Sequence, residues 1–271
     1  MTDQTLTPTF VHLRVHSEYS VVDGTVRLPD LISRTLEQGQ PAVALTDLSN
    51  LFGLIKFYNL ARRSGIKPIA GCDVWITNEE DRDKPFRSLL LVSSPSGYRL
   101  LCELLSRAWL TNTWRAKAEI KRDWLDGAQG LIVLSGARHS DVGQALLAGN
   151  NGSAIKLVRM WRKMLPDAYF IELQRTENEA DHHYSRLAVD LAGNENIPVV
   201  ATHPVQFLKQ DEFSAHEARV CISEGEILSN PNRPKNFTPD QYLKTTLEMV
   251  EAFKDVPSAI HNAVKVAQRC N

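Results

Sequence analysis

Short apolar runs alternate with amphipathic stretches along most of this chain of 271 residues. Seven of the runs suit strands that are buried on both faces, at residues 10–15, 42–46, 68–76, 89–92, 131–134, 169–173 and 198–201. Between them, apolar residues recur at helical spacing, as at Leu28, Leu31 and Ile32, where Gly39 follows as a helix stop. Strands that alternate with helices predict βαβ units and a parallel sheet. Seven strands in this rhythm favour a (βα)7 barrel, and an open doubly wound sheet is the alternative.

The rhythm of strands and helices ends near Phe207. Helical patterns follow, interrupted by a turn-rich segment at 230–234. Thr238 and Pro239 predict the N-cap and first residue of a helix, and residues 252–268 predict a final helix. We therefore expect one domain over residues 1–271, with a barrel at 1–207 and a helical extension at 208–271.

Composition narrows the functional classes. The 31 basic and 32 acidic residues leave a formal charge of -1, which argues against a surface built mainly to grip nucleic acid, although a local basic patch is compatible with it. The four cysteines form no CxxC pair, which is typical of reduced thiols in a cytoplasmic protein. The sequence contains no signal-peptide pattern and no long apolar run, so we expect no membrane partner.

Polar residues follow several of the predicted strands. Active sites of βα barrels lie at the carboxyl ends of the strands, so these residues are the candidate rim of a site. The candidates are Arg14, His16, Asp23, Asp47, Asp73, Glu172 and His203. A metal-dependent hydrolase needs convergent histidine and carboxylate ligands, and the rim offers some of them. It also places a permanent cation, Arg14, among them.

Several motifs stand out along the chain. They are FVHLRVHSEYS at 10–20, followed by Asp23, and then ALTDLSNLFG at 44–53, GIKPIAGCD at 65–73, GLIVLSG at 130–136 and PVVAT at 198–202. The first resembles the opening motif, and the others resemble later motifs, of the polymerase and histidinol phosphatase (PHP) domains of bacterial DNA polymerase III alpha subunits. The resemblance covers nearly the whole chain and implies a distorted (βα)7 TIM-like barrel of the PHP fold, with a C-terminal helical extension that leads to the polymerase palm.

The resemblance also implies a metal cluster with nine ligand positions, of which this chain keeps few. His16 and Asp23 match the family pattern, and Asp73 stands in for a glutamate. The other positions hold Arg14, Leu48, Ser88, Ala137, Pro204 and Gln206. Three scattered donors seldom hold zinc or manganese against water. We therefore expect a vestigial site with no metal cofactor and no catalytic residue, in which Arg14 pairs with Asp23 or Asp73.

The remaining candidates favour structural roles over functional ones. His203 could replace a lost ligand, but a loop or capping role is the simpler interpretation. Trp109 and Trp114 lie near basic residues and could stack bases, but edges of the core are the simpler interpretation. His139 is expected at the surface.

For family members with an intact cluster, the resemblance implies metal-dependent phosphoesterase or proofreading activity. For members with a degraded cluster, it implies a module that stabilises the polymerase and docks a separate proofreading exonuclease subunit. This chain fits the second group. We expect an inactive module of a DNA-directed DNA polymerase, a nucleotidyltransferase. Its partners would be the remaining alpha-chain domains and the exonuclease, and it would meet DNA only through the full polymerase.

Two alternatives belong to the enzyme class. One is a metal-dependent phosphoesterase, a pyrophosphatase or 3′–5′ exonuclease, that uses residual ligands such as His16 and Asp23. The other is a barrel enzyme that acts on a small metabolite, which only the general strand-helix rhythm supports. Bound transition metal would distinguish the phosphoesterase from the docking module.

Overall fold

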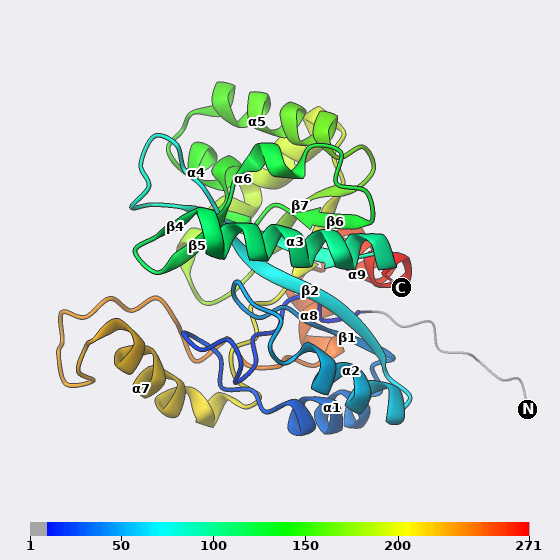
Figure 1. Ribbon diagram of the computed structural model, residues 1–271, viewed down its shortest axis with the longest axis vertical. Coiled ribbons are helices and arrows are strands. Elements are labelled where there is room, and N and C mark those ends of the chain that lie inside the picture. The colour runs from blue at the N-terminus through cyan, green and yellow to red at the C-terminus, as the bar shows by residue number, and fades with distance from the viewer. Residues whose placement is uncertain (1–9, 271) are drawn as a thin grey trace, which may run out of the picture.

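The computed structural model describes residues 10–270, so the predictions for residues 1–9 and 271 lie outside the described residues. The pairing of extended segments closes a ring, and Figure 1 shows helices on either side of these strands. Six strands of the ring are β1 (Ala42–Leu45), β2 (Lys67–Ile76), β3 (Phe86–Val92), β6 (Leu131–Leu134), β7 (Tyr169–Gln174) and β8 (Val199–Thr202). Each pairs with the next in this order.

The segment at 10–17 closes the ring between β1 and the residues that follow β8. On one side, the carbonyl of His12 accepts a hydrogen bond from the Ala44 amide at 2.9 Å. On the other side, Val15 and Val205 form a parallel bridge. All seven predicted apolar runs thus lie in the ring, and the chain has the distorted TIM-like architecture predicted from the sequence.

The prediction of an all-parallel sheet is wrong at β3. This strand runs antiparallel to both of its neighbours, β2 and β6. The connection from β2 to β3 is the short loop at 77–85, with no crossover helix. A connection of that length joins antiparallel strands, whereas a parallel pair needs a crossover of a dozen or more residues.

A hairpin that we did not predict extends the sheet beyond β2. It consists of β4 (Thr113–Trp114) and β5 (Lys117–Ile120), and β5 pairs with the end of β2. Its two turn residues, Arg115 and Ala116, have φ angles of 44° and 63°. Glycine or asparagine usually occupies such positions, so the turn carried no recognisable sequence signal.

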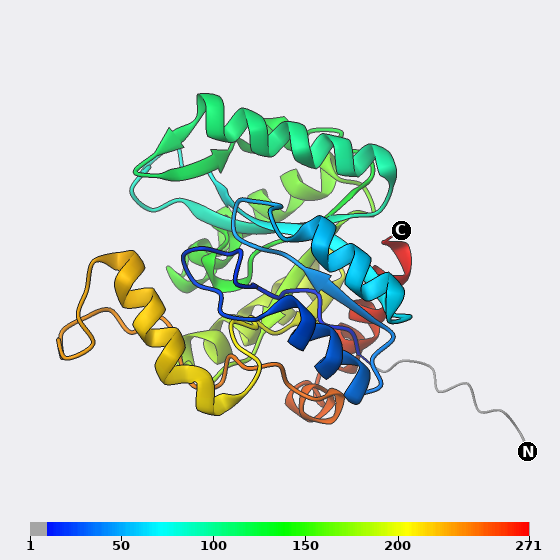
Figure 2. The ribbon, with the colours of Figure 1, turned by 60° about the horizontal axis from the view of Figure 1, so that its bottom comes forward.

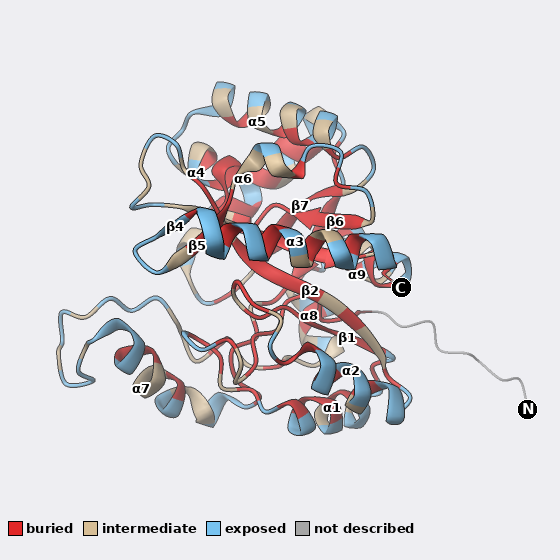
Figure 3. Ribbon diagram, viewed as in Figure 1, coloured by how far each residue is buried: buried red, intermediate tan, exposed pale blue. Residues whose placement is uncertain are grey.

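The helices lie outside the ring, where Figure 3 shows buried residues on their inward faces and exposed residues on their outward faces. They are α1 (Leu28–Glu37), α2 (Leu54–Arg63), α3 (Pro95–Thr111), α4 (Asp141–Leu147), α5 (Asn151–Met164), α6 (Glu179–Glu195), α7 (Phe213–Glu224), α8 (Thr246–Ala252) and α9 (Pro257–Arg269). Three short 3-10 helices are η1 (Arg122–Leu125), η2 (Ala137–His139) and η3 (Gln210–Glu212). Over residues 10–270, no helix is long and apolar enough to cross a membrane.

The C-terminal helices share the core of the barrel. Helix α9 packs on β8, where the Asn262 amide donates a hydrogen bond to the Val199 carbonyl at 2.8 Å. Ala263 and Val266 of α9 belong to the same apolar cluster as the strands. The hydrophobic core therefore continues past residue 207.

The helix predicted to start at Thr238 is absent from the described residues. Residues 238–245 form an irregular strap with a turn at 239–240, and α8 begins after Thr245. The Thr245 hydroxyl accepts a hydrogen bond from the Glu248 amide, while the Glu248 carboxylate accepts one from the Thr245 amide. This capping box satisfies two backbone N–H groups at the helix start, which explains why the helix begins seven residues later than predicted.

Candidate functional site

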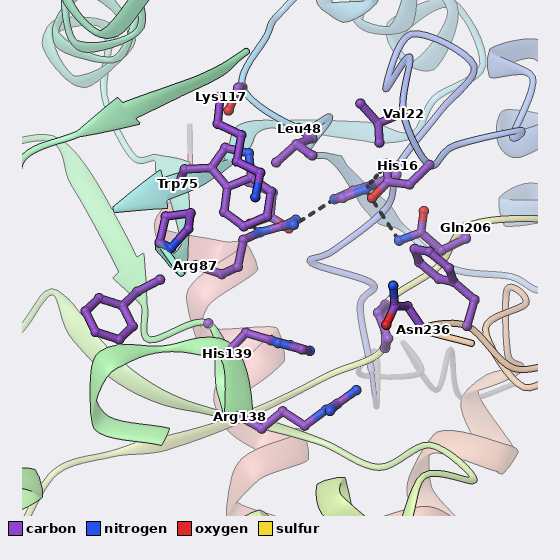
Figure 4. Close-up of a pocket in the computed structure, with 18 of the residues that line it drawn as sticks. His16, Val22, Leu48, Trp75, Arg87, Lys117, Arg138, His139, Gln206 and Asn236 are labelled. Atoms are coloured by element: carbon purple, nitrogen blue, oxygen red, sulfur yellow. Dashed lines mark hydrogen bonds and ion pairs between the residues drawn. The ribbon is translucent and has the colours of Figure 1, made fainter. Parts of the chain in front are cut away.

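A cleft of about 960 Å³ opens at one end of the barrel, and four of the seven predicted rim residues line it. Figure 4 shows Arg87, Arg138 and His139 reaching into it from one side, with Gln206 and Asn236 on the other. Its floor carries Arg14, His16, Asp23 and Asp73. These side chains come from segments that are far apart in the sequence, so the closure of the barrel assembles the site.

Arg14 is buried and binds two carboxylates at once. Its Nε and Nη2 donate to the two carboxylate oxygens of Glu172 at 2.8 and 2.9 Å, and its Nη1 donates to Asp73. Burial alone would lower the pKa of Arg14, but the charges of Asp73 and Glu172 outweigh it and raise the pKa. The predicted pairing with Asp73 is confirmed. The pairing with Glu172 was not predicted, and Asp23 binds a different cation.

His16 lies between two carboxylates. Its Nδ1 is 2.9 Å from Asp23 Oδ1 and its Nε2 is 3.1 Å from Asp73 Oδ2. Burial favours the neutral ring, but Asp23 and Asp73 outweigh burial and raise the pKa of His16 to about 9. At neutral pH the ring is therefore an imidazolium that donates from both nitrogens, and it has no lone pair to offer a metal ion.

Asp73 is the hub of the charged cluster. It accepts hydrogen bonds from Arg14, His16 and Arg87, and Arg87 Nε lies 3.2 Å from its Oδ1. Burial would raise the pKa of Asp73, but Arg14 and Arg87 outweigh it and keep the pKa well below its usual range. The pKa of Asp23 is lowered as well, since the neighbouring His16 outweighs burial.

Arg87 belongs to the charged cluster, whereas the sequence analysis named its neighbour Ser88 among the vestigial positions. In the antiparallel ladder of β2 and β3, Arg87 pairs with Trp75 and Ser88 pairs with Val74. Successive side chains of a strand point to opposite faces, so Arg87 shares the face of Asp73 and Ser88 points away from it. The Ser88 hydroxyl donates to the Leu134 carbonyl at 2.9 Å. The side chain of Ser88 therefore does not face the charged cluster, whereas that of its neighbour Arg87 does.

The other vestigial positions fall into two groups. Leu48, Pro204 and Gln206 line the cleft, and the Gln206 amide approaches His16 Nδ1 to 3.4 Å. Ala137 does not line the cleft and is fully buried in η2, where its φ angle is 52°.

Asp47 and Glu172, both candidates from the sequence, are buried beside the cleft. Asp47 accepts hydrogen bonds from the amide and hydroxyl of Ser17 at 2.6 and 3.0 Å, and burial raises its pKa to about 6. Glu172 accepts hydrogen bonds from the Gly136 amide at 3.0 Å and from the Thr202 hydroxyl, in addition to Arg14. Asp47 orders the loop after residue 16, whereas Glu172 ties η2 and β8 to the charged cluster.

His203 is turned away from the cleft and holds the strap. Its Nε2 is 2.8 Å from the Asp240 carbonyl, and His12 Nε2 is 2.8 Å from the Lys244 carbonyl. His216 of α7 binds the Asp23 carbonyl in the same way at 2.7 Å. The pKa of each of these three histidines is lowered, chiefly by burial, so each ring is neutral and donates from Nε2. His203 is therefore a structural residue, as expected, although it is buried.

The site does not fit the metal cluster of the family. The guanidinium of Arg14 binds the carboxylates of Asp73 and Glu172, and His16, with its pKa raised to about 9, lies between Asp23 and Asp73. Within residues 10–270, no group of three or more His, Cys, Asp or Glu side chains has the arrangement to hold a metal ion.

Comparisons with known proteins agree with this architecture. A family described as the PHP domain matches residues 12–176, and the chain belongs to that family. It resembles the N-terminal region of DNA polymerase III subunit alpha, with 45% identity to the Pseudomonas aeruginosa protein and 42% to the Escherichia coli K12 protein. The chain is covered to 98% and 97% in these two matches but spans only 23% of each relative.

One solved structure with a similar outline is an amidohydrolase from Chromobacterium violaceum. It shares 14% identity and a TM-score of 0.48, and the match covers 77% of this chain and 96% of that one.

Proposed function

We propose that this chain is the PHP domain of a bacterial replicative DNA polymerase III alpha subunit and acts there without catalysis of its own. Its role is to stabilise the polymerase and to dock the proofreading exonuclease subunit. One observation carries the proposal: Arg14 binds Asp73 and Glu172 at the place where the family holds metal ions. The relatives named DNA polymerase III subunit alpha support the assignment to a replicative polymerase.

Charge balance supports a structural role for the cluster. The cations Arg14, Arg87 and protonated His16 face the carboxylates of Asp23, Asp73 and Glu172, so three positive charges meet three negative charges. Buried carboxylates are costly unless they are paired and hydrogen-bonded. Here the protein supplies the compensating charge itself, and the rim folds without a metal.

The setting of the proposed role is inferred from the resemblance to these relatives. Synthesis of DNA belongs to the parts of the alpha subunit outside the region matched here, so this domain meets DNA only through the full polymerase. Its partners are those remaining domains and the exonuclease subunit, in the cytoplasm.

The second candidate function is a metal-dependent phosphoesterase. Its remaining ligands would be His16, Asp23 and Asp73, but each of them is engaged by another side chain of the cluster. A metal ion would have to displace the proton of His16 and compete with two arginines for Asp73. The docking module is therefore the better-supported function.

Elemental mass spectrometry tests the absence of metal directly. The chain is expressed in medium supplemented with zinc and manganese and purified without a tag. We expect a metal content near zero and a melting temperature that chelator does not change. About one bound ion per chain that His16→Gln or Asp23→Asn removes would overturn the proposal in favour of the phosphoesterase.

Binding to the exonuclease subunit of the same replicase tests the second half of the proposal. Isothermal titration calorimetry should detect a complex with a stoichiometry of about one to one, in the presence of chelator. A wild-type chain that melts cooperatively but gives no heat of binding would refute the docking role.

A further inference from the structure

Helix α2 presents an apolar stripe to solvent. Ile55 and Tyr58 are 67% and 49% exposed, and Phe52, just before the helix, is 72% exposed. Ile55 and Tyr58 are three residues apart and therefore lie on the same side of the helix. Figure 2 shows α2 on the outside of the molecule, with no other element in front of it. Single exposed apolar residues are normal, but two on one side of a helix, with a third two residues before its start, form a patch.

Cations without carboxylate partners flank this stripe. Helix α2 contains Lys56, Arg62 and Arg63 and has no acidic residue. Within the described residues, none of these three cations forms an ion pair, and Lys56 Nζ instead binds the Tyr19 hydroxyl at 3.3 Å. The two arginines lie at the C-terminal end of the helix, where a cation is favourable. Lys56 lies in the first turn, where the helix dipole disfavours it, so helix stability does not explain this cation.

We propose that this face, formed by Phe52, Ile55, Tyr58 and the flanking cations and here called the α2 face, docks an amphipathic acidic segment of a protein partner. The partner segment presents apolar side chains to the stripe and carboxylates to Lys56, Arg62 and Arg63. This inference rests on the proposed function, because it gives the docking module its surface. Complementary charges around an apolar centre are the usual arrangement of a specific interface.

The composition of the α2 face disfavours other occupants. A second copy of the chain in a symmetric contact would place Lys56, Arg62 and Arg63 against the same cations of its partner, with no carboxylate on α2 to compensate. Single-stranded nucleic acid needs flat rings in succession, and the aliphatic Ile55 interrupts Phe52 and Tyr58. The size of the face suits a helix, since the ten residues of α2 span about 15 Å, or nearly three turns.

The test measures binding of the exonuclease subunit to wild type and three variants by isothermal titration calorimetry. Ile55→Asp removes the centre of the stripe, and Arg62→Glu with Arg63→Glu reverses the flanking charge. Ile222→Asp is the matched control, because Ile222 is 83% exposed on α7, away from the α2 face. All of these side chains are exposed or flank an exposed face, and circular dichroism with thermal melting confirms that each variant is folded.

We expect Ile55→Asp to raise the Kd about tenfold or more, as for a central apolar anchor. The double charge reversal should raise the Kd and weaken its dependence on sodium chloride, because the complementary charges are lost. Ile222→Asp should bind like wild type. The same order of affinities is expected when the variants are placed in the full alpha subunit.

Two results would overturn the inference and leave the proposed function standing. The first is tight binding of the exonuclease by wild type and by both α2 variants alike. The second is unchanged exonuclease binding together with impaired polymerase activity of the full alpha subunit, which would assign the α2 face to the rest of the polymerase. A wild-type chain that does not bind the exonuclease refutes the proposed docking role itself, and the inference falls with it.

Discussion

Replacing Arg14 by methionine should destabilise the domain more than most single substitutions. In wild type, Arg14 is the cation that binds Glu172, and it shares Asp73 with Arg87 and His16. Methionine fills much of the volume of the arginine stem but leaves Glu172 buried with hydrogen-bond donors and no opposite charge. Asp73 keeps two cations, so the penalty falls mainly on Glu172.

The size of the effect follows from the environment of the pair. Both side chains are almost completely buried, with exposures of 6% and 0%. Removing one partner of a buried ion pair costs about 3–5 kcal/mol, because the other charge is left uncompensated. That loss is a large share of the roughly 5–15 kcal/mol by which a domain is stable.

A double-mutant cycle separates the ion pair from the loss of packing. Urea unfolding at pH 7.5, followed by circular dichroism, gives the free energy of unfolding of wild type, Arg14→Met, Glu172→Gln and the double variant. We expect the loss of unfolding free energy in the double variant to be smaller, by about 2 kcal/mol or more, than the summed losses of the two single variants. A loss below about 1 kcal/mol for Arg14→Met, or strict additivity in the cycle, would refute the view that Arg14 compensates buried charge.

Three further predictions concern single residues. Because the pKa of His16 is raised to about 9, its ion pairs stabilise the fold fully below pH 6.5 and are lost as the pH rises through 9. The melting temperature of His16→Gln should therefore change less between pH 7 and 9 than that of wild type. The pKa of His12 is lowered to about 4, so its contribution is present above pH 6.5 and is lost as the pH falls toward 4; His12→Gln should reduce the acid sensitivity of the melting temperature. Gly136→Ala should cost about 3 kcal/mol or more in urea unfolding, since Gly136 has a φ of 98° and a Cβ would lie 2.1 Å from the Arg87 carbonyl oxygen. Gly152→Ala in α5 is the control and should be neutral or slightly stabilising, because nothing lies within 4 Å of its Cβ position; equal losses at the two glycines would contradict the steric reasoning.

The barrel could be predicted from the sequence because its strands are buried on both faces. Runs such as 131–134 and 169–173 are apolar throughout and therefore stand out against the amphipathic helices. The direction of β3 could not be predicted in this way, since an antiparallel strand in the same buried position has the same pattern. The β4–β5 hairpin was missed because Arg115 and Ala116 have positive φ angles. Glycine or asparagine usually indicates such a turn in a sequence, and neither is present at these two positions.

The ion pairs of the site could be predicted only where the sequence indicated which side chains face one another. Arg14 lies in the extended segment at 10–17 and Asp73 lies in β2, which are near one another in the ring. Opposite charges at one rim of a barrel are expected to pair. Glu172 is farther along the sequence, and nothing in its own motif indicated that it would bind Arg14. Arg87 was missed because the sequence does not show which face of β3 points toward the cleft, and Arg87 and Ser88 lie on opposite faces of that strand.

Under the proposed function, the loss of the metal site is a coupled change that one substitution should not reverse. Restoring a ligand at Arg14 alone would remove a cation from a cluster in which three cations balance three carboxylates. The variant would then depend on metal for its stability before the remaining ligands could bind that metal tightly, because Arg87 would still occupy Asp73 and the side chain of Leu48 cannot coordinate. Each such step lowers stability unless the others accompany it. The charge balance of the cluster is therefore the physical reason to expect that single substitutions at this site do not restore metal binding.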